Sequence, residues 1–480
     1  MSFQSTIFIA FFCVLLCILS VTKREMVRQV EILIASGIFY GLWDIKFLLL
    51  MMVCIVIMRC SVALIIRSKE HNATGKTPMV IGIVLLLVIL GVFKYLGFFI
   101  SGFSKLLGLS ESGTTINIFL PIGISFYIFS AIGYIIDSYR GDIDEQPSVL
   151  KEALYIMFFP KILQGPLQNA VDFFNQLKKE HPIELRNLES GIQIFLFGLI
   201  KKVVIADRLG RFVDSVFVCP SAYSGATLAL AVLTYPFQLY CDFSGYSDIA
   251  VATAKMMGYD LTQNFNLPFL SQNVAEFWRR WHMSLNIWFR DYLFYPILRS
   301  NWVNGLRKRV KKVNKELSRK LPAIIGMLIV WPLIGLWHGA SVNFILYGCG
   351  FGILMIIGQL LGEKPGDSVI INTLKIVRTF FLTAFLLLIF RAETLDSVGI
   401  IIKGIVTWQR GISYIYTWSI VYLPFVCLIS IYAYLKNAGN GYYINMDMSK
   451  FMSKVWFATA VLMTIVLMYV GDNFFVYFKF

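Results

Sequence analysis

The chain has 480 residues, of which 58% are hydrophobic and 15% charged, and its mean hydropathy is +0.71. Because soluble domains are about 45–50% apolar and about 25% charged, this composition excludes an ordinary cytosolic enzyme, a disordered chain and a small disulfide scaffold. The net charge of +15 fits basic cytoplasmic loops beside anionic headgroups better than nucleic acid, so we expect a polytopic protein of the lipid bilayer with no nucleic-acid partner.

The N-terminal apolar segment predicts a retained first span. Residues 1–22 contain no Asp, Glu, Lys or Arg and are followed by Lys23, Arg24 and Arg28, whereas a signal peptide has its positive charge first. The positive-inside rule then predicts an N-terminus outside the cytoplasmic membrane. Because a span needs about 20 mostly apolar residues, we expect an all-α, multi-pass protein with about eleven transmembrane helices. The further candidate spans lie near 31–44, 46–66, 78–100, 115–137, 190–206, 222–241, 321–337, 340–362, 369–391, 414–436 and 455–471.

Two apolar segments, 150–170 and 240–300, are broken by Pro, Gly and charged residues. They are typical of re-entrant or interfacial pieces, which a bilayer tolerates where protein or water satisfies the backbone. Nothing in the sequence marks a separate soluble domain. We therefore expect a single membrane domain over 1–480, with its core motifs in 115–362.

The segment 299–320 carries the strongest cytoplasmic signal. It holds nine basic residues against one acid, Glu316, and residues 321–362 directly after it contain no Asp, Glu, Lys or Arg. A solvated, lipid-facing loop would account for this charge. The alternative is a docking surface for an anionic carrier or cofactor.

His338 is the titratable group of note within the charge-free segment and is the predicted general base. A helix that begins near Leu321 would place it about 25 Å along the axis, past the middle of the bilayer. Polar groups at that depth usually face a cavity or a partner, and desolvation favours the neutral imidazole that a base requires. Gly339 and Ala340 leave space for a ligand. A buried histidine bonded to a backbone carbonyl is the alternative.

His282 lies in a segment rich in aromatic and basic residues. If the segment is helical, one ridge carries the residues at i, i+3, i+4 and i+7, namely Trp278, Trp281, His282, Leu285, Trp288, Phe289 and Tyr292. An amphipathic helix at the membrane interface is one interpretation. In the other, the ridge lines a tunnel for an acyl chain or thioester arm, with Arg279, Arg280 or Arg290 near a phosphate.

Other catalytic motifs are absent from the sequence. It contains no GxSxG elbow, no GxxxxGK[ST] loop and no GxGxxG after a strand. Its eight cysteines form no CxxC and no cluster with histidine, so we expect no metal site and no disulfide framework. Direct attack by a substrate hydroxyl, deprotonated by histidine, needs fewer groups and fits what remains.

Several segments resemble the membrane-bound O-acyltransferase family, in the branch of bacterial alginate O-acetylation proteins. The longest is Tyr240–Phe294, with the run DFSGYSD…NFN.P…EFWRRWH.SL..W.RDYL. The others are LPIGISFYIFSAIGYIIDSYRG (Leu120–Gly141), FPKILQGPL (Phe159–Leu167), LWHGASVNFILYGCGFG (Leu336–Gly352) and the C-terminal FFVYFKF.

The resemblance implies a multi-helix membrane fold with a tunnel near His338, the histidine of the WHG motif, and assigns His282 as the second family histidine. Such proteins move an acyl group to a hydroxyl, often on a secreted polymer. The donor is acyl-CoA or an acyl-carrier thioester, used as a substrate rather than a bound cofactor, and a separate extracytoplasmic acetyltransferase can complete the transfer. One departure is Phe351, which stands where these proteins often have a further histidine.

On this basis we expect a membrane O-acyltransferase that carries an acyl group from a cytosolic thioester to an extracytoplasmic polysaccharide. The expected acyl group is acetyl. His338 would act as base, and His282 would orient or polarise the donor carbonyl. The expected donor-binding residues are Asn266, Trp278, Arg279, Arg280, Trp281, Arg290 and Trp337. The alternatives are D-alanyl or other acyl transfer from a carrier protein to teichoic acid, a transporter of polysaccharide or lipid carrier without chemistry, and a non-catalytic scaffold.

Overall fold

The computed structural model describes residues 3–106, 119–143, 145–362, 368–413 and 446–467. The described residues form helices and one isolated β-bridge, with no strand among them, which confirms the all-α prediction. By its contacts the chain divides into two compact units. One comprises Met1–Phe195 with Tyr246–Thr262, and the other comprises Leu196–Gly245 with Gln263–Phe480. The predicted single domain stays a prediction.

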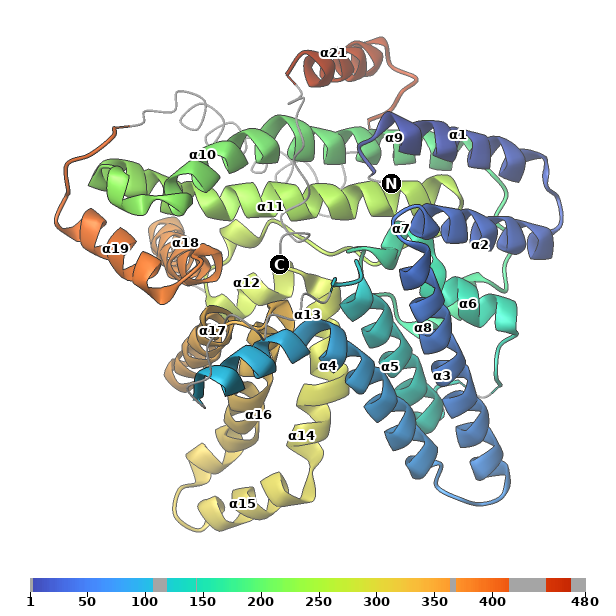
Figure 1. Ribbon diagram of the computed structural model, residues 1–480, viewed down its shortest axis with the longest axis horizontal. Coiled ribbons are helices and arrows are strands. Elements are labelled where there is room, and N and C mark those ends of the chain that lie inside the picture. The colour runs from blue at the N-terminus through green and yellow to red at the C-terminus, as the bar shows by residue number, and fades with distance from the viewer. Residues whose placement is uncertain (1–2, 107–118, 144, 363–367, 414–445, 468–480) are drawn as a thin grey trace. The chain divides into compact units, whose positions relative to one another are not determined.

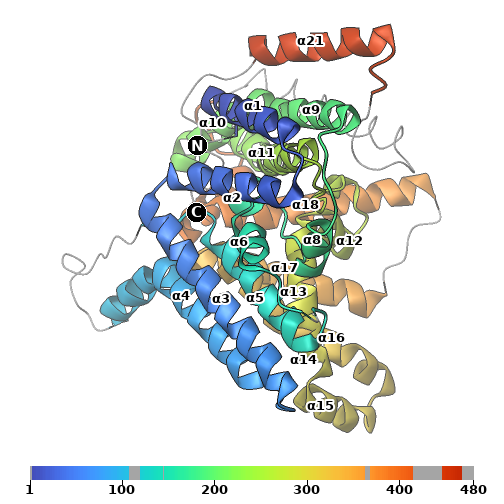
Figure 2. The ribbon, with the colours of Figure 1, turned by 90° about the vertical axis from the view of Figure 1, so that its right-hand side faces the viewer.

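The first unit is built around three long helices that lie side by side in both views, α3, α4 and α5 (Figures 1 and 2). Its core contains the buried carboxylate of Glu152, which accepts hydrogen bonds from Tyr134, Gln146 and Arg59. Satisfying a buried carboxylate in this way removes the cost of its desolvation. The helices are α1 Thr6–Val21, α2 Glu25–Gly41, α3 Ile45–Glu70, α4 Lys76–Leu106, α5 Ile124–Arg140, α6 Val149–Met157, α7 Phe159–Ile162, α8 Ala170–Gln176 and most of α9 Leu185–Leu199.

The second unit contains every residue predicted for the site. It begins in α9, includes a π-helix, and takes in the N-terminal two thirds of α11. Its elements are η2 Ile200–Ala206, α10 Asp207–Val218, η3 Pro220–Ala222, α11 Gly225–Met256, η4 Pro268–Leu270, α12 Val274–Arg280, α13 Met283–Phe289, η5 Arg290–Phe294, α14 Tyr295–Arg299, α15 Asn301–Lys311, α16 Lys315–His338, α17 Val342–Leu361, α18 Val369–Arg391, α19 Leu395–Val406 and α21 Phe451–Leu467.

Five of the described helices are long and apolar enough to cross a membrane: α3, α4, α16, α17 and α18. They match the predicted spans 46–66, 78–100, 321–337, 340–362 and 369–391. The predicted number of eleven is not confirmed, because α1 and α21 are apolar but shorter, and α2 and α5 have 17 residues each. The expected span 414–436 and the FFVYFKF motif lie outside the described residues.

The two segments predicted to be broken, 150–170 and 240–300, do contain breaks, but the second begins later than predicted. The predicted break from 240 onward starts later, because α11 continues as one helix of 32 residues to Met256. The short helices η4, α12, α13 and α14 follow it. Segment 150–170 breaks at Phe158, whose backbone (φ −53°, ψ 103°) leaves the helical region between α6 and α7.

Candidate active site

Close backbone contact fixes the two helices that carry His338. A Cβ on Gly335 of α16 would lie 2.1 Å from the carbonyl oxygen of Phe344, and one on Gly348 of α17 would lie 2.2 Å from that of Trp331. Small residues at such crossings let two membrane helices approach each other closely. The junction between the helices is therefore held in place from both sides.

His338 is the last residue of α16, and aromatic rings from three elements surround it. Its ring centroid lies 4.7 Å from that of Trp337, 5.0 Å from Phe390 of α18 and 5.8 Å from Tyr347 of α17. The side chain is 7% exposed. The next residue, Gly339, has no side chain, and a Cβ at this position would lie only 2.4 Å from the ring of Phe344. The WHG motif thus places one imidazole in an apolar, tightly packed corner.

The expected helical ridge over 278–292 is wrong, because the chain breaks at His282. The helix α12 ends at Arg280, Trp281 is extended, and His282 has a left-handed backbone (φ 45°, ψ 51°). A non-glycine residue in this region is strained. The side chain of Asn264 offsets the strain through three hydrogen bonds. Its Oδ1 accepts the backbone N–H of Ser284 at 3.2 Å and the hydroxyl of Ser284 at 3.0 Å, and it is bonded to Nδ1 of His282 at 3.1 Å.

The same contacts assign the protonation of His282. Asn264 Oδ1 already accepts from Ser284 and can only accept, so Nδ1 of His282 carries the proton and Nε2 carries the lone pair. Burial lowers the pKa of His282 to about 3. The ring is therefore neutral at physiological pH. A neutral ring in this tautomer accepts a hydrogen bond through Nε2 and does not polarise a carbonyl by donation.

The lowered pKa predicts a pH-dependent stability. In the unfolded chain the imidazole titrates near 6.5, so below that pH the unfolded state binds a proton that the folded state does not. The contribution of the neutral, buried His282 to the free energy of unfolding is complete above about pH 6.5, and it falls by about 2 kcal/mol when the pH is lowered to 5. Thermal melting at pH 7.5 and 5.0 should therefore show a larger acid-induced drop for the wild type than for His282→Asn. Equal drops would contradict a neutral, buried His282.

Trp337 joins the two histidines. Its ring centroid lies 5.9 Å from that of His282 and 4.7 Å from that of His338, each in an edge-to-face arrangement. On its other side, His282 meets Phe243 of α11 at 4.7 Å. Residues separated by 56 positions are thus brought to one indole. The two predicted catalytic histidines and Trp337 form one cluster, which we call the histidine–tryptophan cluster.

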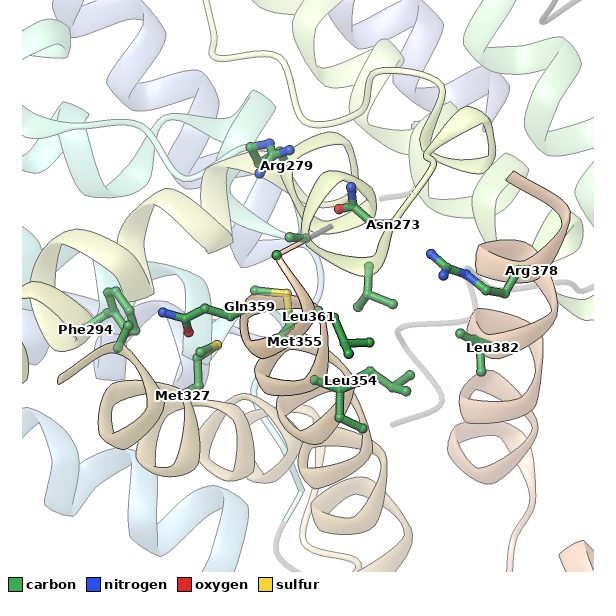
Figure 3. A pocket seen from close by; sticks show the side chains of 16 residues that line it. Asn273, Arg279, Phe294, Met327, Leu354, Met355, Gln359, Leu361, Arg378 and Leu382 are labelled. Carbon is green, nitrogen blue, oxygen red and sulfur yellow. The ribbon is translucent and has the colours of Figure 1, made fainter. Parts of the chain in front are cut away.

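A cavity of 510 Å³ opens among α12, α16, α17 and α18. Figure 3 shows two arginines approaching it from different helices, Arg279 of α12 and Arg378 of α18, with Leu354 and Met355 of α17 between them. Its other walls are mainly apolar, including Met327. Arg378 donates to the carbonyl of Gln272 at 3.2 Å. Arg279 has no hydrogen bond or ion pair to any described residue, so its guanidinium can bind an anion.

The other predicted donor-binding residues at 266–290 contact neighbouring residues of the protein. Arg280 pairs with Glu276 at 2.7 Å, and its backbone carbonyl accepts the N–H of Asn266 at 2.9 Å. Arg290 is half exposed and pairs with Asp291 at 2.8 Å, which raises its pKa. Trp281 packs against Phe277, with centroids 5.5 Å apart. Arg280 and Arg290 are thus already paired with carboxylates of the protein, and Asn266 is bonded through its backbone, whereas Arg279 lines the cavity.

Trp278 is buried among aromatic rings and is not one of the residues that line this cavity. It is 3% exposed, its ring lies 4.7 Å from Trp331 and 5.1 Å from Phe351, and its indole Nε1 has no hydrogen-bond acceptor among the described residues. Phe351 is itself fully buried, so the residue that departs from the family pattern completes an aromatic wall.

Sequence reasoning missed Asn264, the residue that orients His282. It belongs to the same NFN run as Asn266, whose selection rested on the resemblance. The family run alone could have drawn attention to both asparagines. Only the backbone break at His282 distinguishes the one whose side chain bonds the ring.

Comparisons with known proteins identify the family of this chain. The sequence model of the membrane-bound O-acyltransferase family matches residues 32–361. The "Probable alginate O-acetylase AlgI" of Pseudomonas aeruginosa is 35% identical over 402 residues, 82% of this chain and 73% of that protein. The "Peptidoglycan O-acetyltransferase" of Helicobacter pylori is 29% identical over 80% of this chain and 75% of that protein. The "Teichoic acid D-alanyltransferase" of Bacillus subtilis is 31% identical over 50% of this chain and 59% of that protein.

The family model covers more than half of the chain, which is a multi-pass membrane protein. The chain therefore belongs to the membrane-bound O-acyltransferase family, in the branch of the alginate O-acetylation proteins, and is an O-acyltransferase.

Proposed function

We propose that this O-acyltransferase moves an acyl group, by preference acetyl, from a cytosolic thioester to a hydroxyl of an extracytoplasmic polysaccharide. The observation that carries the proposal is the histidine–tryptophan cluster, which lies at the far end of α16 from the basic segment 299–320. Relatives named for alginate and peptidoglycan O-acetylation, similar over about four fifths of this chain, support the acceptor class.

The chemistry assigned to the cluster is direct acyl transfer. His338 removes the proton of the acceptor hydroxyl as its oxygen bonds to the thioester carbonyl carbon. The carbon–sulfur bond then breaks, and the thiolate leaves with the proton returned by His338. His282, neutral and with its lone pair on Nε2, accepts a hydrogen bond from the acceptor or from an amide of the donor arm. Its role is therefore orientation.

For the donor, the proposal assigns the 510 Å³ cavity as the entrance for a phosphate-bearing thioester arm. Arg279 would bind the phosphate, as guanidinium groups commonly do. The buried indole N–H of Trp278 would donate to a carbonyl of the arm. The proposal also puts segment 299–320 on the cytosolic side, the N-terminus outside and an extracytoplasmic acetyltransferase as a possible acceptor-side partner.

A second candidate is D-alanyl transfer from a carrier protein to teichoic acid. The Bacillus subtilis relative favours it, but that similarity covers half of this chain, against about four fifths for the O-acetylation relatives. The two candidates share the histidine chemistry and differ in the acyl group and acceptor.

The proposal is tested with inside-out membrane vesicles, in which the cytosolic face is accessible. One arm receives radiolabelled acetyl-CoA, and a parallel arm receives an acyl carrier protein charged with labelled acetyl or D-alanyl. We expect base-labile ester label on polymer inside vesicles that contain the protein. Polymer that enters the vesicles without acquiring label would instead identify a transporter.

Arg279→Gln should weaken donor binding without slowing chemistry. Loss of one charge-assisted hydrogen bond costs about 1.5–3 kcal/mol, so we expect the half-saturating donor concentration to rise about 10-fold or more, with nearly unchanged maximal turnover. Arg290→Gln is the matched control, since Arg290 is paired with Asp291. Equal effects of the two substitutions would refute the specific role of Arg279.

A further inference from the structure

A buried ion cluster joins Lys202 of the π-helix η2 to Asp207 of α10 and Asp242 of α11. The ammonium of Lys202 lies 2.6 Å from a carboxylate oxygen of Asp242 and 2.8 Å from one of Asp207. All three side chains are at least nine-tenths buried. The backbone N–H of Asp207 also bonds the carbonyl of Lys202. Two independent bonds therefore close this widened turn, and π-helical turns occur frequently at functional sites.

The π-helix also touches the backbone of α11 directly. A Cβ on Gly245 would lie 2.8 Å from the carbonyl oxygen of Gly198 and 3.2 Å from the backbone nitrogen of Lys202. Lys201 places its ammonium 5.5 Å from the ring centroid of Tyr240. Lys201 and Lys202 of η2 thus contact Tyr240 and Asp242 in the α11 segment 240–245. Gly245 allows the backbones of η2 and α11 to approach closely.

That α11 segment supports the strained loop of the site. Phe243, the residue after Asp242, lies 4.7 Å from the ring of His282, edge to face. Tyr240 lies 6.3 Å from Trp281. Phe243 and Tyr240 both also contact Phe265, beside Asn264. A shift of the turn that carries Asp242 would therefore move Tyr240 and Phe243, whose rings pack against Trp281 and His282 respectively.

We propose that Lys202 is a positioning residue for acyl transfer: its ion cluster with Asp207 and Asp242 sets the place of the α11 turn whose Phe243 supports His282. Lys202 touches no reacting group and acts through Phe243. This inference rests on the proposed role of His282 in orientation.

The physical case against a purely stabilising role comes from the energetics of buried ions. Breaking a buried ion cluster by removing one member is strongly destabilising, but replacing all of its members by well-packed hydrophobic residues of similar volume is often neutral or stabilising. A charge-free variant should therefore fold. It would lack the short, directional contacts that set the α11 turn, and errors of about 1 Å in catalytic geometry can cost 100-fold in rate.

The test uses the full-length protein in lipid nanodiscs and the triple variant Lys202→Met/Asp207→Leu/Asp242→Leu. With acetyl-CoA or the charged carrier as donor, whichever the vesicle experiment selects, we expect at least 10-fold lower turnover and an unchanged half-saturating donor concentration. Wild-type turnover in the folded triple variant would overturn the proposal. The control is Arg59→Met/Glu152→Gln, which removes an ion pair between a partly exposed arginine and a buried carboxylate in the first unit, and should leave turnover per folded molecule unchanged.

A double-mutant cycle with His282→Ala locates the effect. If the ion cluster acts through His282, the triple substitution should slow the His282→Ala protein less than 3-fold, because interacting residues are not additive. Full additivity would contradict the inference. Normal turnover of His282→Ala alone would instead refute the proposed role of His282.

A third variant keeps the inference testable if the triple variant fails to fold. Phe243→Leu removes the ring beneath His282 and leaves every ion in place. It should reproduce the loss of turnover with unchanged half-saturation. Wild-type turnover of Phe243→Leu would overturn the inference by itself.

Discussion

His338→Ala is expected to lower acyl transfer at least 100-fold while leaving the protein folded and inserted. A positioned general base contributes about 10²–10⁴-fold to a proton-transfer step, and the rings of Trp337, Tyr347 and Phe390 pack around this imidazole. Alanine leaves a small apolar space that those rings can tolerate. The vesicle assay, normalised to the amount of inserted protein, measures the change.

The matched control is His71→Ala. His71 follows α3 at its C-terminal cap, in the polar turn Lys69-Glu70-His71, and belongs to the first unit. It should leave transfer unchanged. Normal transfer by His338→Ala would remove the proposed mechanism, and equal losses from both substitutions would indicate a general effect of losing a histidine.

Gly335→Ala is expected to destabilise the second unit. The added Cβ would lie 2.1 Å from the carbonyl oxygen of Phe344 and 2.9 Å from its carbonyl carbon. Both are backbone atoms that cannot rotate away, so α16 and α17 must separate. Overpacking typically costs about 1–3 kcal/mol and occasionally more. We expect a clearly lower melting temperature and less folded protein in size-exclusion profiles.

Gly305→Ala is its matched control. Gly305 is also helical, in α15, but a Cβ there meets nothing within 4 Å. Alanine is better than glycine inside a helix by about 0.5–1 kcal/mol, so this variant should be as stable as the wild type or more so. If Gly335→Ala were equally harmless, the close crossing of α16 and α17 would be wrong.

The sequence predicted the features that depend on long, local patterns. Mean hydropathy and charge-free runs identified α3, α4, α16, α17 and α18, because crossing a bilayer imposes a composition on about 20 consecutive residues. His338 was predictable for the same reason: a lone imidazole in a charge-free stretch is costly unless it has a function. Its aromatic surroundings come from α17 and α18 and were not visible in the pattern.

The break at His282 depends on a residue far along the chain. The spacing of Trp278, Trp281 and His282 fits a continuous helix, and only the side chain of Asn264, 18 residues earlier, stabilises the turn that interrupts it. Arg279 and Arg280 are likewise equivalent in the sequence. Glu276, four residues before Arg280, binds that arginine and leaves its neighbour facing the cavity.

The most direct test of acyl transfer to an envelope polysaccharide is the ester content of those polymers, measured by mass spectrometry. Cells that lack the protein are compared with the same cells carrying either the wild type or His338→Ala. We predict that one polymer loses its ester groups, that the wild type restores them and that His338→Ala does not. Unchanged ester content in cells without the protein, or full restoration by His338→Ala, would contradict the proposed function.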